Sequence, residues 1–176
     1  MNEDLILHLI GSFPEIPGKK VFQKLSYFLQ EAEGARLGVR FKMRRYGPYS
    51  AELEDRLQDL AERHLVSISG SSDEGFRISF SEDAPTDLPD LDNEDELALE
   101  RLKKIFRNEL SRGLTLELLA SLHFLAKGHP YGGTEEEIER LVKQVQAWKG
   151  KKFDPSFIQN QVARLEEIGY LELQAP

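Results

Sequence analysis

The sequence predicts a mostly α protein with small antiparallel β wings, an α+β fold of the winged helix-turn-helix class. Three observations support this prediction. Apolar residues recur at helical spacing in several segments, two alternating segments flank a short polar loop, and an acidic, proline-containing segment separates two halves. Helices followed by a two-stranded hairpin form the outline of a winged helix.

Residues 1–80 are predicted to form a first winged-helix-like domain. Hydrophobic periodicity predicts helices over residues 4–10, 19–33 and 51–63. Alternation predicts strands over residues 39–46, 65–69 and 76–80, the last two forming a hairpin. Gly47-Pro48 is typical of a turn, and Ser50 is a suitable N-cap for the helix that follows.

Residues 81–96 are rich in acidic side chains and proline, and we expect a linker there. Residues 97–176 are predicted to form a second, helical, winged-helix-like domain. Helices are expected from about residue 94 to 113, 115 to 127, 134 to 150 and 155 to 168, with a short strand over 170–173. Thr115 is the expected cap of the second of these helices, Thr134 with Glu137 forms a capping box, and Asp154 precedes a proline at the first helical position.

An internal similarity favours two tandem winged-helix-like units. Five apolar positions of the third helix and the following strand recur 105 residues later, as Ile158, Val162, Leu165, Leu171 and Leu173. In both copies a helix ends and a short strand follows. An unrelated amphipathic helix running into a strand would produce the same match, so this alternative stays open.

Composition restricts the class of protein. The chain has 176 residues, is 40% hydrophobic and 31% charged, and contains no cysteine, which excludes disulfides and thiolate metal sites. No apolar run approaches the roughly 20 residues that span a bilayer, and the N-terminus is acidic where a signal peptide is basic. We therefore expect a cytoplasmic protein without membrane contacts.

Charge is unevenly distributed along the chain. The net charge of −8 argues against a protein that coats nucleic acid. Residues 19–45 nevertheless hold eight Lys and Arg against two Glu, whereas residues 81–100 hold nine Asp and Glu and no base. The basic and acidic segments are expected to bind each other or different partners.

Residues 18–68 resemble the N-terminal part of the YwgA-like proteins and, more distantly, the Panacea (SocA-like) family. The resemblance depends on three motifs: Gly18-Lys19-Lys20, Phe22-Gln23-Lys24-Leu25-Ser26-Tyr27 and Tyr46-Gly47-Pro48-Tyr49-Ser50. It covers about a third of the chain. It implies a winged-helix fold, a prokaryotic host and, on the Panacea side, regulatory or antitoxin-like roles through protein contacts; it implies no catalytic residues.

The residues themselves also give no enzyme motif. None of the four histidines has a partner at metal-ligand spacing, so we expect no metal and no cofactor. His129 lies in a loop, where a functional group is more common, but a packing role is favoured. No pair of carboxylates has surroundings that would shift a pKa. We therefore predict that the protein is not an enzyme.

Two basic sets are candidates for binding nucleic acid or a protein partner. The helix over residues 51–63 carries too many carboxylates to enter a DNA groove. In the C-terminal half, lysines precede a helix with amide side chains suited to phosphates and adenine edges: Lys149, Lys151, Lys152, Gln159, Asn160 and Arg164. The N-terminal candidates are Lys19, Lys20, Lys24, Arg40, Lys42, Arg44 and Arg45.

These patterns favour a non-enzymatic prokaryotic regulatory protein that binds DNA or protein through winged helices, with a role in transcription regulation. The alternative is a protein-protein interaction module of the antitoxin or adaptor type that does not bind DNA. A homodimer is a further open alternative, because the aromatic and leucine content suffices for an interface.

Overall fold

The computed structural model describes residues 1–71, 75–84 and 87–171. This part of the chain contains seven α-helices, a short 3₁₀ helix and two antiparallel two-stranded sheets, which confirms an α+β fold. The N-terminal elements are α1 (Glu3–Gly11), α2 (Lys19–Glu31), β1 (Lys42–Arg44), β2 (Gly47–Tyr49), α3 (Ala51–Glu62), β3 (Val66–Ser71) and β4 (Gly75–Phe80). The C-terminal elements are α4 (Asn93–Phe106), α5 (Gly113–Ala126), α6 (Glu135–Lys149), the 3₁₀ turn η1 (Gly150–Lys152) and α7 (Pro155–Glu167).

Several predicted helix starts are confirmed at the level of the cap. The Ser50 side chain accepts a hydrogen bond from the Leu53 amide, and Thr134 forms the predicted capping box with Glu137. Asp154 caps α7 ahead of its proline. The predicted Thr115 cap is wrong, because α5 already begins at Gly113 without a side-chain cap. Such a start is decided by burial of the helix and not by its local capping chemistry.

The predicted hairpin is confirmed, and β3 pairs with β4 in register from Val66 opposite Phe80 to Ser71 opposite Gly75. Part of its loop, residues 72–74, lies outside the described residues. Ile16 forms a further antiparallel bridge to Ile78, which ties the segment before α2 to this sheet. The predicted helix-then-hairpin order is therefore present at α3, β3 and β4.

The prediction of a turn at Gly47-Pro48 is wrong. The turn is formed by Arg45 and Tyr46, and Gly47 to Tyr49 form β2, which pairs with β1. The predicted strand over residues 39–46 is shortened to the three residues of β1. Proline is tolerated here because a two-stranded sheet consists only of edge strands, where one missing amide donor does not interrupt a central ladder.

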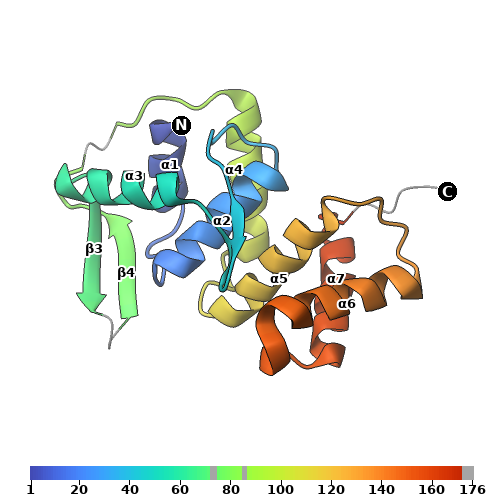
Figure 1. Ribbon diagram of the computed structural model, residues 1–176. Coiled ribbons are helices and arrows are strands. Elements are labelled where there is room, and N and C mark those ends of the chain that lie inside the picture. Colours follow the sequence, from blue (N-terminus) through green and yellow to red (C-terminus); the bar gives the residue numbers. More distant parts are fainter. Residues whose placement is uncertain (72–74, 85–86, 172–176) are drawn as a thin grey trace.

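Helix α2 is the centre of the molecule. Nine consecutive residues from Val21 to Leu29 are buried, so this helix is covered on all sides. In Figure 1, α1, α3 and the β3–β4 hairpin lie to one side of it and α5, α6 and α7 to the other. It contacts α3, α4, α5, β2 and β4. The division of the chain into two domains at residues 81–96 stays a prediction.

The C-terminal helices pack against one another, with α5 in contact with both α6 and α7. Helix α4 ends at Phe106, earlier than predicted, and a series of turns leads to α5. The predicted terminal strand is wrong where it is described: Tyr170 and Leu171 form a bend, and the remaining two residues lie outside the described residues. No helix in the described part is both long and apolar enough to cross a membrane.

Side chains of α2 hold β2 in place. The Gln23 amide group donates to the Ser50 carbonyl and accepts from the Ser50 amide, both at 2.9 Å. The Lys24 Nζ donates to the Pro48 carbonyl at 2.7 Å. The two sequence motifs that carry the resemblance are thus joined by hydrogen bonds, and both Gln23 and Lys24 are buried by this contact.

Gly47 lies where β2 passes between α2 and α5. Its φ of +89° is unfavourable for any residue with a Cβ. An added Cβ would lie 2.9 Å from the Ser121 Oγ and 3.1 Å from the Lys24 Cε. The close approach of the strand to both helices therefore requires glycine at this position.

We expect Gly47→Ala to destabilise the fold by roughly 3 kcal/mol or more, because backbone strain and overpacking add. Gly34→Ala is the matched control, since Gly34 also has a positive φ of +80° but no atom within 4 Å of an added Cβ. That variant should lose only the backbone term, about 1 kcal/mol. Urea unfolding of both variants measures the difference, and equal losses would contradict the close approach.

Candidate cationic site

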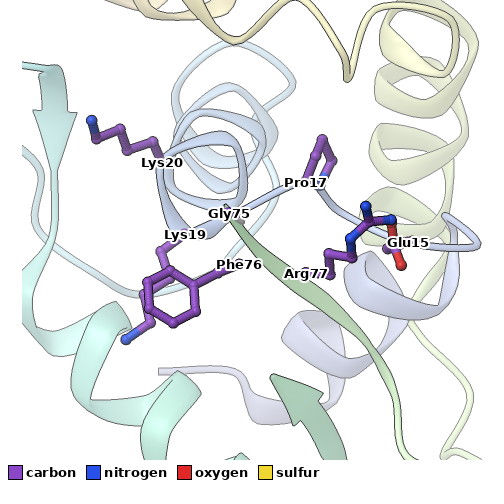
Figure 2. A pocket seen from close by; sticks show the side chains of 8 residues that line it. Glu15, Pro17, Lys19, Lys20, Gly75, Phe76 and Arg77 are labelled. Carbon is purple, nitrogen blue, oxygen red and sulfur yellow. The ribbon is translucent and has the colours of Figure 1, made fainter. Parts of the chain in front are cut away.

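Three hollows meet at Lys20, at the start of α2. The first, of about 550 Å³, lies between the start of α2 and β4, and Figure 2 shows its lining. The second, of about 510 Å³, extends to the start of α5, and the third, of about 190 Å³, lies over β1 and β2. Lys20 lines all three. We call the combined lining the Lys20 surface.

The Lys20 surface is positively charged in a chain with a net charge of −8. Its lining contains three carboxylates, Glu15, Glu54 and Glu117. It contains seven cationic side chains: Lys19, Lys20, Lys24, Arg44, Arg77, Arg112 and Lys152. An anion would therefore be drawn to this face of the protein in preference to the rest of it.

Two exposed aromatic rings lie on this surface, each beside a cation. Tyr46 is 41% exposed, and the Lys20 Nζ lies 3.7 Å from its ring centroid. The Lys152 Nζ lies 5.4 Å from the same centroid. Phe76 is 39% exposed, and the Lys19 Nζ lies 5.7 Å from its centroid. Cations at these distances are attracted to the ring faces.

Figure 2 shows that Lys19 and Lys20 leave the start of α2 in different directions, Lys19 behind the Phe76 ring and Lys20 away from it. Lys19 forms an ion pair with Glu54 at 2.7 Å. On the far side of the hollow, Arg77 pairs with Glu15 at 3.0 Å. Lys20 has no ion pair among the described residues, and its amine lies over the Tyr46 ring.

Glu117 holds the C-terminal lysines at this site. The Lys149 Nζ donates to Glu117 Oε1 at 2.9 Å and to the Arg45 carbonyl, and the Lys152 Nζ donates to both carboxylate oxygens at 2.9 Å. Burial pushes the pKa of Glu117 upward, but the hydrogen bonds from Lys152 and Lys149 outweigh it and hold that pKa below its ordinary value. The carboxylate therefore stays ionised and neutralises one lysine.

Lys24 is an unusual member of the set because only 3% of it is exposed. Burial lowers the pKa of its amine to about 8, and the positive charges of Lys149 and Lys20 act in the same direction, against the attraction of Glu117. Near neutral pH the amine is thus protonated but easily deprotonated. Its hydrogen bond to Pro48 is compatible with either state, because both forms carry donor hydrogens.

The structure brings together residues that were predicted as two separate sets. Lys19, Lys20, Lys24 and Arg44 from the N-terminal set line the same surface as Lys152 from the C-terminal set. Lys149 lies next to this surface, because its Nζ donates to Glu117 and to the Arg45 carbonyl. The remaining predicted residues lie elsewhere: Arg40, Lys42, Lys151, Gln159 and Asn160 do not line these hollows, and Arg164 forms an ion pair with Glu109.

Two predicted contact residues are less accessible than their type suggests. Lys24 is buried, and the side chain of Lys149 is 1% exposed. Each would have to leave its present hydrogen bonds to contact a phosphate. Tyr46, Phe76, Arg112 and Glu117 were missed as site residues. Glu117 had a signal, because it is the only acidic residue in the strongly apolar sequence of α5.

The lining of the Lys20 surface offers positive charge and exposed ring faces. In the hollow between α2 and α5, as far as the structure describes it, Glu117 is the only carboxylate, and it is bonded to two lysines. A pair of carboxylates for general acid and base catalysis is therefore not assembled there. The described residues also contain no cluster of His, Asp and Glu that could hold a metal ion.

Comparison with known proteins relates most of the chain to an enzyme. No protein family profile matches the sequence. A protein of Thermus aquaticus named "DNA ADP-ribosyl glycohydrolase" is 31% identical over 147 residues, which is 82% of this chain and 39% of that protein. The chain thus spans about two fifths of the length of this relative. More than half of the relative has no counterpart in the aligned segment.

This relationship corrects the functional prediction. The sequence was interpreted as a non-enzymatic regulator, with an interaction module as the alternative, and the match to a glycohydrolase contradicts that interpretation. The same match contradicts the prediction that the chain is not an enzyme, and it leaves the predicted roles in transcription regulation and as an antitoxin without support. The error has a physical reason: the chain shows no local catalytic motif, and absence of a motif was taken as absence of an enzymatic role. The resemblance to YwgA-like and Panacea proteins stays a prediction.

We expect Glu117→Gln to destabilise the protein by about 3 kcal/mol at pH 7, because the buried Lys149 would lose its counter-charge. Adding Lys149→Met removes the uncompensated charge, so the double variant should recover at least half of this loss. Urea unfolding of the two variants measures both effects. A double variant less stable than Glu117→Gln would show that Lys149 does not depend on this carboxylate.

Lys24 gives a pH dependence of stability. Because its folded pKa of about 8 lies below the ordinary value of 10.5, the unfolded chain binds a proton that the folded chain releases between these pH values. Stability therefore rises with pH, by about 2 kcal/mol between pH 8 and 9.5, before tyrosine ionisation in the unfolded chain opposes it. Lys24→Met should flatten this rise, whereas Lys143→Met at an exposed site of α6 should not. An unchanged rise in Lys24→Met would contradict the assignment.

Proposed function

We propose that this chain acts in the enzymatic removal of ADP-ribose from DNA, and that the Lys20 surface holds phosphates of the ADP-ribosylated DNA. The observation that carries the proposal is the 31% identity to a DNA ADP-ribosyl glycohydrolase over 82% of the chain. The charge of the Lys20 surface supports it independently, because both DNA and an ADP-ribosyl group are polyanions.

The ADP-ribosyl group suits this surface better than unmodified DNA does. It adds a pyrophosphate, and therefore two negative charges, next to the DNA backbone. Lys20 and Arg112 are exposed, have no ion pair among the described residues, and line the hollow of about 510 Å³. This volume lies within the range of typical ligand sites. Tyr46 on the same hollow offers an exposed ring face for stacking a base.

The charge of α3 favours an approach of the DNA from the side of the Lys20 surface. Helix α3 carries Glu52, Glu54, Asp55, Asp59 and Glu62, so a phosphate backbone is repelled from it. We propose that α3 and the β3–β4 hairpin form a winged-helix unit that serves as a scaffold. In this arrangement the DNA approaches the start of α2. It does not approach α3, which holds the place of the helix that enters the major groove in DNA-binding winged helices. A second winged-helix-like unit at the C-terminus stays a prediction.

The proposal is tested by fluorescence anisotropy with one oligonucleotide, unmodified and carrying a single ADP-ribosyl group, across salt concentrations. The modified oligonucleotide should bind several-fold tighter, because it presents two additional charges. Lys20→Ala with Arg112→Ala should weaken binding about tenfold at low salt, lower the salt slope by about 2 and abolish the preference. Neither side chain contacts Glu117, so the fold should be retained.

Lys104→Ala with Lys143→Ala removes the same charge at exposed positions of α4 and α6 and is the matched control. Equal loss of binding in both double variants would show that only the net charge matters and would contradict a site at Lys20 and Arg112.

Release of ADP-ribose is followed in the same samples by chromatography. Release that falls with Lys20→Ala and Arg112→Ala would assign the cleavage to this chain. Binding without release would assign the cleavage to the regions that only the relative has. If the chain shows no binding and no release, the proposal is overturned.

A further inference from the structure

A second pocket lies at the other end of α5, away from the Lys20 surface. It has a volume of about 250 Å³, which is the size of one small ring system rather than of a dinucleotide. Its lining comes from the ends of α2 and α5 and from the two segments that follow α5 and α7. Its polar and aromatic lining residues include Glu31, His123, Lys127, His129, Tyr131 and Tyr170. We call it the His123 pocket.

His123 presents a hydrogen-bond donor to this pocket. Its ring is 5% exposed, and its Nδ1 lies 2.7 Å from the Tyr27 hydroxyl, which is itself buried. Burial raises the pKa of Tyr27, so the hydroxyl keeps its proton, and Nδ1 is the acceptor available to it among the described residues. The imidazole is neutral, because burial lowers the pKa of His123 to about 4. Its own hydrogen is therefore on Nε2.

The Nε2–H group has no protein acceptor in the part of the chain that the structure describes. His123 lines the pocket, so an acceptor on a bound ligand can receive this hydrogen. Glu31 supplies the opposite chemistry at the same pocket. The pKa of Glu31 is lowered: burial raises it, but hydrogen bonds from Lys127 and Gln30 outweigh that effect, so the group is an ionised acceptor.

The backbone makes the His123 pocket unfavourable for anions. The C-cap residues of α2, α5 and α7 are Ala32, Lys127 and Ile168, and all three lie at or next to the pocket lining. Each C-terminus contributes partial negative charge and carbonyl acceptors. Lys127 is already paired with Glu31. A phosphate is therefore disfavoured here, in contrast to the Lys20 surface.

Ring side chains form part of the wall. Tyr131 and Tyr170 line the pocket together with His123 and His129, and the His123 and Tyr170 rings lie 6.1 Å apart at 64°. Their hydroxyls are engaged by other groups, Tyr131 with Glu166 and Tyr170 with Glu33. The tyrosine hydroxyls therefore do not compete for the polar atoms of a flat ligand, and the partly exposed Tyr170 contributes ring surface to the wall.

We propose that the His123 pocket binds an adenine-type base, a flat heteroaromatic ring that bears an exocyclic amino group. A ring nitrogen accepts the His123 Nε2 hydrogen, and the amino group donates to the Glu31 carboxylate. The shared chemistry is the adenine ring, whether it comes as the free base or as part of a nucleotide. This site is independent of the proposed action on DNA, because it shares no residue with the Lys20 surface.

The test is a titration of the full chain with adenine, followed by the ¹H and ¹⁵N resonances of the His123 imidazole. Adenine should shift these resonances in a saturable way. Hypoxanthine has the same size but carries a carbonyl where adenine has the amino group, so it should bind at least tenfold more weakly. Inorganic phosphate should cause no saturable shift. Adenosine monophosphate distinguishes the source, since tighter binding than adenine indicates a nucleotide and weaker binding a free base.

Glu31→Gln keeps the shape of the side chain and should weaken adenine binding at least fivefold. Glu139→Gln, an exposed carboxylate of α6, should leave it unchanged and is the matched control. No saturable shift with adenine, equal binding of hypoxanthine, or full binding by Glu31→Gln would each overturn the proposal. Lys20→Ala with Arg112→Ala should still bind adenine. A failure of the DNA proposal is therefore distinguishable from a failure of this one.

Discussion

The fold depends on the attachment of β2 to the face of α2. Gln23 satisfies both backbone groups of Ser50, Lys24 satisfies the Pro48 carbonyl, and Gly47 lets the strand approach α5 without a side chain in between. A short two-stranded sheet is marginal by itself, so these contacts supply the order that pairing alone does not. They also fix the start of α3, because Ser50 is its N-cap.

This attachment places charge in the interior and so creates the cationic site. Lys24 is buried because its amine is needed at the Pro48 carbonyl, and a buried ammonium is costly without a counter-charge. Glu117 is the nearby carboxylate, but it is already bonded to Lys149 and Lys152. One carboxylate is therefore the counter-charge for three lysines, Lys24, Lys149 and Lys152. The excess of cations makes this face positively charged in a protein with a net charge of −8.

Local features of the fold could be predicted from the sequence, and long-range ones could not. The caps at Ser50 and Thr134 and the β3–β4 hairpin follow from neighbouring residues, and all three are confirmed. The Gly47-Pro48 turn was wrong because the strand character of β2 comes from its contact with α2, not from its own residues. The site was predicted as two sets because Lys20 and Lys152 are far apart in sequence. Hydrophobic periodicity identifies helices and strands but does not tell which of them lie close together in space. Its aromatic members were missed because exposed rings and core rings look alike in a sequence.

Helix α5 shows why a strongly apolar helix can still organise polar sites. Eight consecutive residues from Leu116 to His123 are buried, and the helix contacts α2, α6 and α7. Only Glu117 and His123 within it are ionisable, and each interrupts the apolar sequence where the helix meets a hollow. In a buried helix, every polar side chain requires a partner or a cavity. Glu117 has lysine partners and remains charged, whereas His123 has one hydroxyl partner and remains neutral. The first therefore shapes a surface for anions, and the second a pocket for an uncharged ring.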